Sequence, residues 1–374
     1  GMSVITPLTP TDAPEDIGLS SEVCEEVIHY MQSWIDTDRT PAAAIGLARQ
    51  GWVLTRGFGM MTLEPDGAAL PADAIFLVAS VTKPVTCAAA ALLLERGLIQ
   101  LESPVHAIVP EFKGQGKEAI TVHHLLTHTS GLPDMIPENM EYRKEFRPLD
   151  DFIKRICTVD LLFAPGTGIS YQSTGIAMLG EIVKRITGTP LPEFLREEFF
   201  LPLGMNDTSL GNRHIDDSRI PTIRVPENQI DAEWHWNRAY WRGLGAPWGG
   251  MFTTVKDMNI FLQTFLNGGA YGDTRILTSE TVTDMIADHT DSMPGIPDKA
   301  KKEQAWGLGW RLNRPAMVYG STCPPTSRTF GHGGATGTMN WADPGTGLSC
   351  VLFTTQPEMH GSDEFQRITD MVAG

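Results

Sequence analysis

A serine and a lysine three residues apart form the first pair in this sequence that could do covalent chemistry. The segment Ser80-Val81-Thr82-Lys83 is the one S-x-x-K tetrapeptide in the chain, and it lies just before a nearly all-apolar segment, residues 85–96. A lysine three residues after a serine at a helix start returns to the same helix face and can activate the hydroxyl as a nucleophile. A serine N-cap followed by an exposed lysine remains an alternative, since a chain of this length contains about one such tetrapeptide by chance.

Two tyrosine triplets are candidates for the group that moves the proton. Tyr171-Gln172-Ser173 follows the loop residues 163–166 and precedes an expected helix, and Tyr319-Gly320-Ser321 has the same short pattern. A tyrosine can act as a base if a nearby cation such as Lys83 lowers its pKa from about 10. For either tyrosine the plainer interpretation is a half-buried ring with a satisfied hydroxyl.

A glycine-rich segment near the other end of the chain is the third candidate. The sequence G-H-G-G-A-T-G, residues 331–337, precedes an expected strand. Consecutive glycines let a substrate approach the backbone closely, although a glycine-rich turn would have the same composition.

Taken together, in this order and spacing, the three segments resemble the class C β-lactamase and penicillin-binding-protein superfamily, whose members carry S-x-x-K, Y-x-N and K-T-G. The resemblance extends from about residue 20 to the end of the chain. Further matching stretches are L-L-T-H-T-S-G-L at 125–132, P-G at 165–166, P-L-G-M at 202–205, G-G-M at 249–251 and W-G-L-G-W at 306–310. The resemblance implies an α+β fold, with an antiparallel sheet flanked by helices, an inserted and mostly helical lobe, and the active site between them.

The resemblance also implies roles for individual residues. Ser80 would be the nucleophile, Lys83 its partner and Tyr171 the general base or acid. The backbone N–H groups of Ser80 and Ala335 would form the oxyanion hole, where the loss of one donor typically costs about 2.7 to 4 kcal/mol. The residues expected to contact the substrate are Ser173, His332, Gly333, Gly334 and Trp341.

Two departures from the family pattern narrow the expected function. Ser173 stands in place of the asparagine of Y-x-N, and His332 stands in place of the lysine of K-T-G. Histidine has an ordinary pKa of about 6.5, so it is mostly neutral at pH 7, charges toward pH 6 and binds a carboxylate less well than lysine does. We therefore expect a serine hydrolase of uncharged esters, possibly amides, resembling the family VIII carboxylesterases and their acyl-transferring relatives. A β-lactamase, a D-amino-acid peptidase or amidase, and a non-catalytic binding protein on the same fold remain alternatives.

The elements that must position these residues follow a simple order along the chain. Expected strands lie near both ends, and the middle of the chain is mostly helical. We expect strands at 43–48, 52–57, 307–312, 339–342 and 348–354. We expect helices at 20–36, 85–96, 122–126, 174–187, 257–266 and 362–372, and long surface loops at 133–150 and 288–304. This predicts an α/β lobe from residues 1–79 and 300–374 and a mostly helical lobe from 80–299.

The composition limits the partners. The 374 residues include 45 acidic and 29 basic side chains, a formal charge of -16, which disfavours nucleic acid and anionic membranes. We expect a small-molecule ester or amide substrate, no cofactor and no metal. Residues 2–20 have no basic residue and no apolar run, so we expect a cytoplasmic protein. The oligomeric state is not predicted.

The cysteines, the histidines and an aromatic-rich segment give three smaller signals. Five widely spaced cysteines suit reduced thiols. His124 and His128 are four residues apart, with His123 adjacent, but the glutamate of H-E-x-x-H is missing and the segment matches the superfamily, which argues against zinc. The rings of an aromatic-rich segment could line an apolar pocket or pack in the core; they are Trp234, Trp236, Tyr240, Trp241 and Trp248.

Overall fold

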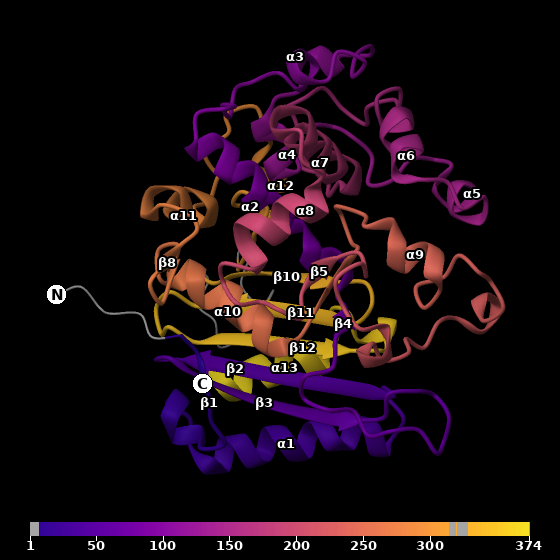
Figure 1. Cartoon of the computed structure of the whole chain (residues 1–374). Coiled ribbons are helices and arrows are strands. Elements are labelled where there is room, and N and C mark those ends of the chain that lie inside the picture. The colour runs from indigo at the N-terminus through magenta and orange to yellow at the C-terminus, as the bar shows by residue number, and fades with distance from the viewer. Residues whose placement is uncertain (1–6, 314–318, 320–327, 374) are drawn as a thin grey trace.

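The computed structural model describes residues 7–313, 319 and 328–373. A seven-stranded sheet with the order β1-β3-β2-β12-β11-β10-β9 runs through the centre of the molecule (Figure 1). Its strands are β1 (Thr9–Pro10), β2 (Ala42–Arg49), β3 (Trp52–Gly59), β9 (Arg311–Leu312), β10 (Phe330–Gly334), β11 (Thr338–Ala342) and β12 (Ser349–Thr354). Because β2 pairs with β12, the two chain ends build one sheet, as predicted.

The register of the sheet follows from its turns. β2 and β3 form the predicted hairpin, in which Gln50 and Gly51 have φ angles of 57° and 83°. Positive φ at both turn positions matches the twist of the flanking strands. The neighbouring strands of the sheet pair antiparallel except for β1 and β3, which are parallel, so the expectation of a wholly antiparallel sheet is wrong at that edge.

One face of the sheet is covered by the terminal helices α1 (Ser21–Asp36) and α13 (Asp363–Ala373) (Figure 1). The Ser20 side chain accepts from the backbone N–H of Val23 and caps α1, as predicted. Apolar residues of α1 at helical spacing pack against alternate residues of β2, which are Ala43, Ile45 and Leu47. The opposite face of β2 contributes Ala42, Ala44 and Ala48 to a second, larger core.

This larger core lies between the sheet and the helical region. The helices of the helical region are α2 (Thr82–Glu95), α3 (Val105–Ile108), α4 (Val122–Thr127), α5 (Asn139–Lys144), α6 (Leu149–Ile156), α7 (Ser173–Thr187), α8 (Leu191–Leu195), α9 (Ala239–Leu244), α10 (Val255–Leu266), α11 (Ser279–Ile286) and α12 (Asp298–Glu303). Short strands complete it: β4 (Phe76–Leu77), β5 (Ser209–Leu210) and β6 (Met251–Thr253) in one small sheet, and β7 (Ala270–Tyr271) with β8 (Thr274–Arg275).

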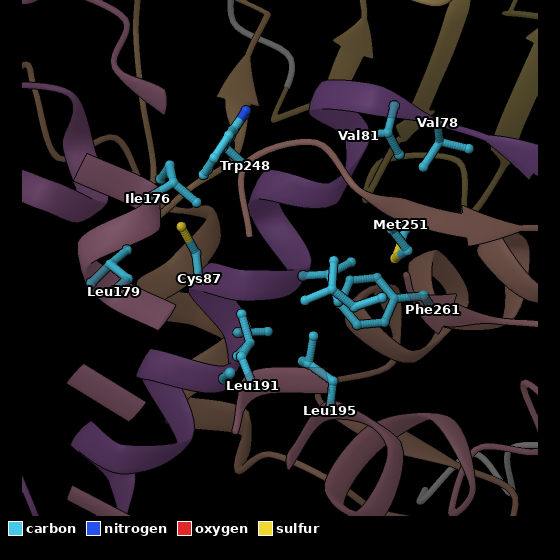
Figure 2. Close-up of a cluster of buried hydrophobic side chains, with 14 of the residues drawn as sticks. Val78, Val81, Cys87, Ile176, Leu179, Leu191, Leu195, Trp248, Met251 and Phe261 are labelled. Carbon is cyan, nitrogen blue, oxygen red and sulfur yellow. The ribbon is translucent and has the colours of Figure 1, made fainter. Parts of the chain in front are cut away.

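Helix α2 runs through the middle of this core. Residues 82–93 of α2 are all buried, polar ones included. Figure 2 shows Cys87 of α2 beside Ile176 and Leu179 of α7, with Leu191 and Leu195 of α8 below. A helix that is apolar on all sides is stable only when packed on all sides, so the first residues of α2 are held rigidly.

Three expectations for local structure are corrected. The strand expected at 307–312 is limited to β9, because residues 306–310 form a loop in which Gly309 has a φ of 89° and donates to Leu126 O. Residues 330–334 form strand β10, so the glycine-rich turn that the composition also allowed is limited to residues 335–337. The stretches 133–150 and 288–304 contain α5, α12 and the start of α6. The proposed lobe boundaries remain a prediction.

No helix among residues 7–313 and 328–373 is both long and apolar enough to cross a membrane. Cys24, Cys87 and Cys157 are buried free thiols, whereas Cys323 lies outside the described residues.

Candidate active site

The nucleophile candidate lies on a strained turn between β4 and α2. Ser80 belongs to the 3₁₀ turn η2 (Ala79–Val81), and Ala79 has a φ of 49°, which is uncommon for a residue other than glycine. The Thr82 hydroxyl donates to Ala79 O at 2.6 Å, and Val78 N donates to Met251 O at 3.0 Å. These bonds hold the turn in a conformation that the chain would otherwise avoid, and Ser80 lines the main cavity.

Lys83 lies beneath the serine. Its Nζ donates to Ser80 Oγ at 2.8 Å and to Trp248 O at 3.0 Å. Only 1% of the residue is exposed, and burial lowers the pKa of the ammonium to about 7, against a smaller opposing effect of Asp134. A substantial fraction of Lys83 is therefore neutral near pH 7 and can accept the proton of Ser80.

Tyr171 is the second proton-handling group. The Lys83 Nζ lies 4.5 Å from the centroid of the Tyr171 ring. Burial raises the pKa of the Tyr171 hydroxyl well above its ordinary value, and a hydrogen bond with Ser80 offsets this only in part. Since the pKa of Tyr171 is raised and not lowered, the structure favours Lys83 as the resting base, a choice that the sequence left open. A protonated Tyr171 can instead donate to a leaving group.

His128 holds Tyr171 in place. Its ring stacks on that of Tyr171 with centroids 4.9 Å apart, and its Nδ1 accepts from Gln172 N at 3.0 Å. Burial lowers the pKa of His128 well below its ordinary value, so the ring is neutral. The Trp306 ring packs against both of these rings, with its centroid 4.2 Å from that of His128 and 6.0 Å from that of Tyr171.

The residues expected to form the oxyanion hole lie where β10 meets the nucleophile turn. The hydroxyls of Thr336 and Thr338 donate to the backbone oxygens of Leu77 and Val78, both at 2.9 Å. A Cβ atom added to Gly334 would lie 2.3 Å from Val78 O and 3.3 Å from Ser80 N, so only glycine permits this approach. Ser80 and Ala335 both line the cavity, as an oxyanion hole requires.

The Y-x-S triplet is fixed by an acidic residue that we did not predict. Asp134 Oδ1 accepts from Ser173 N at 2.9 Å and from Ser173 Oγ at 2.8 Å. This bond caps the N-terminus of α7 and orients the turn that carries Tyr171. Ser173 and Asp134 both line the cavity.

His332 lies on β10, in the position of the family's lysine. Only 4% of the residue is exposed, and its Nδ1 is 2.6 Å from Gly333 O. Burial, followed by the charge of Lys83, lowers the pKa of His332 to about 3. The imidazole is therefore neutral, and our expectation that it charges toward pH 6 is wrong in this environment. His332 and Gly333 line the cavity.

The cavity has a volume of about 740 Å³ and is walled by aromatic and basic side chains. Trp236, Trp241 and Trp248 of the aromatic-rich segment line it, as do Trp306, Arg143 and Arg311. Trp341 does not, which corrects our prediction. It is fully buried in the core under the terminal helices, where its Nε1 donates to Thr369 Oγ1 at 2.9 Å.

The remaining sequence candidates are placed outside this chemistry. Tyr319 donates its hydroxyl to Arg311 O at 2.7 Å, while Gly320 and Ser321 lie outside the described residues. His123 contacts His289 at 2.9 Å between ring nitrogens, and His124 accepts from Thr121 N at 3.0 Å. The three histidines of the 123–128 segment thus point to different partners instead of converging on one metal site.

This geometry was compared with known proteins. The sequence pattern of the β-lactamase family matches residues 27–373. The chain belongs to the β-lactamase family. The superfamily and fold predicted from the three motifs are therefore confirmed, and the chain is a serine hydrolase of the β-lactamase type.

Relatives within the family carry different activities in their names. The chain is 24% identical to a putative D-alanyl-D-alanine carboxypeptidase of Escherichia coli (strain K12), over 96% of this chain and 88% of the relative. EstCE1, a hydrolase with promiscuous acyltransferase activity, superposes with a TM-score of 0.78 at 22% identity, covering 94% of this chain and 98% of EstCE1. A family VIII carboxylesterase superposes with a TM-score of 0.76 at 23% identity, covering 95% and 98%.

Sequence reasoning missed four residues around the site. Asp134 and His128 lie beside or within the stretch 125–132 that carried the resemblance, and Arg311 follows the stretch 306–310, so proximity to a motif was an available signal. Arg143 lies in the stretch 133–150, which was interpreted as a surface loop that could border a cleft, but no signal singled out this residue.

Proposed function

We propose that this protein is a carboxylesterase-type serine hydrolase that forms an acyl-enzyme at Ser80 and can pass the acyl group to water or another alcohol. The observation that carries the proposal is the neutral, buried His332 on β10, where lactam-processing relatives are expected to have a lysine. A neutral ester needs no cation at this point, whereas the carboxylate of a β-lactam does.

The steps follow from the contacts around Ser80. Neutral Lys83 takes the proton of Ser80 as the hydroxyl attacks the ester carbonyl, and the N–H groups of Ser80 and Ala335 stabilise the oxyanion. The proton then passes through Tyr171 to the departing alkoxide. Water attacks the acyl-enzyme by the reverse proton path and releases the acid. The names of EstCE1 and the family VIII carboxylesterase support ester chemistry in this fold.

A substrate panel tests the proposal. We expect kcat/KM for p-nitrophenyl butyrate to exceed that for nitrocefin and for D-alanine amides, and we expect a fluorophosphonate probe to label Ser80. If nitrocefin or a D-amino-acid amide is turned over as fast as the best ester, the esterase proposal fails. An unlabelled Ser80 would favour a binding protein.

The His332→Lys variant makes the same test from within the site. A lysine there adds a charge-assisted hydrogen bond of about 1.5 to 3 kcal/mol to a substrate carboxylate, so the rate ratio of nitrocefin to p-nitrophenyl butyrate should rise about tenfold or more. His332→Gln is the neutral control and should leave the ratio near that of the parent. An unchanged ratio in a folded His332→Lys protein would show that the cation is not what the lactam lacks.

A second candidate, a D-amino-acid peptidase, is favoured by Arg311. Its guanidinium lies 5.6 Å from the Trp306 ring centroid and lines the cavity, and its buried Nη1 finds no hydrogen-bond acceptor among the described residues. A C-terminal carboxylate of a peptide could fill that role, and the name of the Escherichia coli relative agrees. A peptide ending in D-alanyl-D-alanine distinguishes the two, because Arg311→Gln should slow its hydrolysis and spare p-nitrophenyl butyrate.

A further inference from the structure

Arg143 of α5 is a cation that lies over two indole rings, one of which belongs to the cavity wall. Its guanidinium carbon lies 5.1 Å from the ring centroid of Trp234 and 4.6 Å from that of Trp241. Nη2 donates to Trp234 O at 3.0 Å, which fixes the rotation of the group. The guanidinium is therefore preorganised, and Arg143 and Trp241 both line the cavity.

This cation has no anion within the described residues. Burial lowers the pKa of Arg143 to about 10, and Tyr240 is the one group that acts in the opposite direction. Nε is buried without an acceptor, and no hydrogen bond from Nη1 is found in the described part of the chain. The contrast with Arg147, which pairs with Glu145 and Asp151, is informative because the protein has 45 acidic residues from which a partner could have come.

The position of Arg143 relative to the chemistry indicates which part of a substrate it meets. Tyr171 must face the leaving group to protonate it, and the indole stacked beside Tyr171 is Trp306. Arg143 belongs instead to α5, which lies on the same side of the molecule as α9 (Figure 1). There the Tyr240 hydroxyl of α9 donates to Arg147 O at 2.7 Å. An acyl group that points away from Tyr171 and Trp306 would meet Trp241 and Arg143, which line the same cavity.

We propose, building on the ester hydrolysis proposed above, that Arg143 binds a carboxylate at the far end of the acyl group. The preferred substrates are then half-esters of dicarboxylic acids. The charge of Asp134, whose carboxylate accepts from Ser173, repels a carboxylate near the triplet. Of the two arginines that line the cavity, Arg311 lies over Trp306, on the side assigned to the leaving group, so Arg143 is the cation that the acyl group can reach. The centroid of the neutral His332 ring lies 5.9 Å from that of Tyr171, on the same leaving-group side.

Matched substrate pairs test this directly. The p-nitrophenyl esters of adipic and suberic acid carry either a free terminal carboxylate or a terminal carboxamide of the same length. These chains are too long for the carboxylate to expel p-nitrophenol readily by itself. We expect the parent to favour the carboxylate member of at least one pair by about tenfold or more in kcat/KM. A ratio of one or less in the parent overturns the subsite without any variant.

Variants show whether Arg143 carries the preference. Arg143→Gln should bring the ratio close to one, and Arg143→Lys, which keeps the charge without the planar fork, should keep part of it. The matched control is Arg238→Gln, on the same side of the molecule, because Arg238 donates to His235 Nε2 and Ile230 O and does not line the cavity. Its ratio should equal that of the parent. An equal ratio in Arg143→Gln and the parent overturns the proposal.

A binding measurement separates this proposal from the esterase proposal. Free adipate should slow fluorophosphonate labelling of Ser80 in the parent more than adipamide does, and Arg143→Gln should abolish the difference. If no ester is hydrolysed but adipate protects Ser80 in this way, the esterase proposal fails and the anion subsite stands. If esters are hydrolysed and adipate protects no better than adipamide, the subsite fails alone.

Discussion

The three reactive side chains, Ser80, Lys83 and Tyr171, contact one another on a rigidly packed part of the molecule, here called the base. The side of the cavity at α5 and α9, here called the wall, carries Arg143, which has no anionic partner among the residues that the structure describes. Lys83 is buried in α2 and bonded to Ser80 and Trp248, and the Tyr171 ring is stacked on His128. The wall at α5 and α9 consists of short helices and loops. Its cation, Arg143, contacts two ring faces and one backbone carbonyl oxygen. The base makes its contacts inside the chain, whereas Arg143 has no anionic partner within the described residues.

This difference assigns chemistry and specificity to separate parts of the molecule. A base fixed by core packing serves any acyl transfer, which agrees with the variety of activities named among relatives of the same fold. A wall carried by short helices and loops can change without disturbing the core. Changes at the base should therefore affect all substrates alike, and changes at the wall should alter ratios between substrates.

The largest effect is expected from Ser80→Ala, which removes the nucleophile from the base. Hydrolysis of every ester should fall by at least about a thousandfold, because the covalent step is lost. Alanine fits the turn at modest cost, so the thermal midpoint should stay close to that of the parent. More than a tenth of the parent activity in a folded Ser80→Ala protein would rule out this assignment.

Lys83→Ala and Tyr171→Phe test whether the reactive side chains act as one unit. Each should lower kcat by about a hundredfold to ten-thousandfold, and the double variant should be little slower than the slower single variant, because both residues serve one proton path. The measurement is kcat for p-nitrophenyl butyrate in all four proteins. Losses that multiply in the double variant would show that the two residues act independently.

The sequence predicted the proximity of Ser80 and Lys83 for a physical reason. Ser80 and Lys83 are close because helical spacing alone brings them together. The glycines of 331–337 were expected to let a substrate approach, whereas the close approach that Gly334 makes is to the nucleophile turn of the protein itself. The pKa values were not predictable, because they depend on what covers each group. Burial leaves Lys83 titrating at about 7 and His332 at about 3, and nothing in the tetrapeptide or the glycine-rich segment encodes that burial.

The wall was predicted less well, since its residues meet only through long-range packing. The aromatic-rich segment was recognised, but Trp341 was wrongly added because it follows a motif in sequence. Strand alternation sends it to the far face of the sheet, under the terminal helices. Arg143 was not predictable, because its contact with Trp234 depends on how α5 packs against that segment.

A smaller effect is expected from Gly334→Ala, which disturbs the contact between β10 and the nucleophile turn. The added methyl would meet Val78 O at 2.3 Å and Thr338 Oγ1 at 2.2 Å, so β10 must move away from Ser80. We expect kcat to fall about a hundredfold, comparable to the loss of one oxyanion donor, for all esters alike. Gly243→Ala is the control, because its methyl would meet no atom within 4 Å. A loss confined to one substrate would place Gly334 in the wall rather than the base.

The smallest effect is expected from Asp134→Asn, which lies where base and wall meet. Asn keeps an acceptor for Ser173 while removing the negative charge that raises the pKa of Lys83 toward its value of about 7. Since acylation needs neutral Lys83, kcat/KM in the parent should rise as the pH increases through about 7.

Without the Asp134 charge the pKa of Lys83 falls, so the rise in kcat/KM should move to lower pH by roughly half a unit. Near pH 6 the variant should therefore react about two to three times faster than the parent. The measurement is the pH dependence of fluorophosphonate labelling, which reports acylation without a substrate charge. Glu303→Gln is the matched control, because Glu303 also lines the cavity but is not among the groups that shift Lys83. A shift to higher pH in Asp134→Asn, or an equal shift in Glu303→Gln, would mean that Lys83 is not the group that titrates.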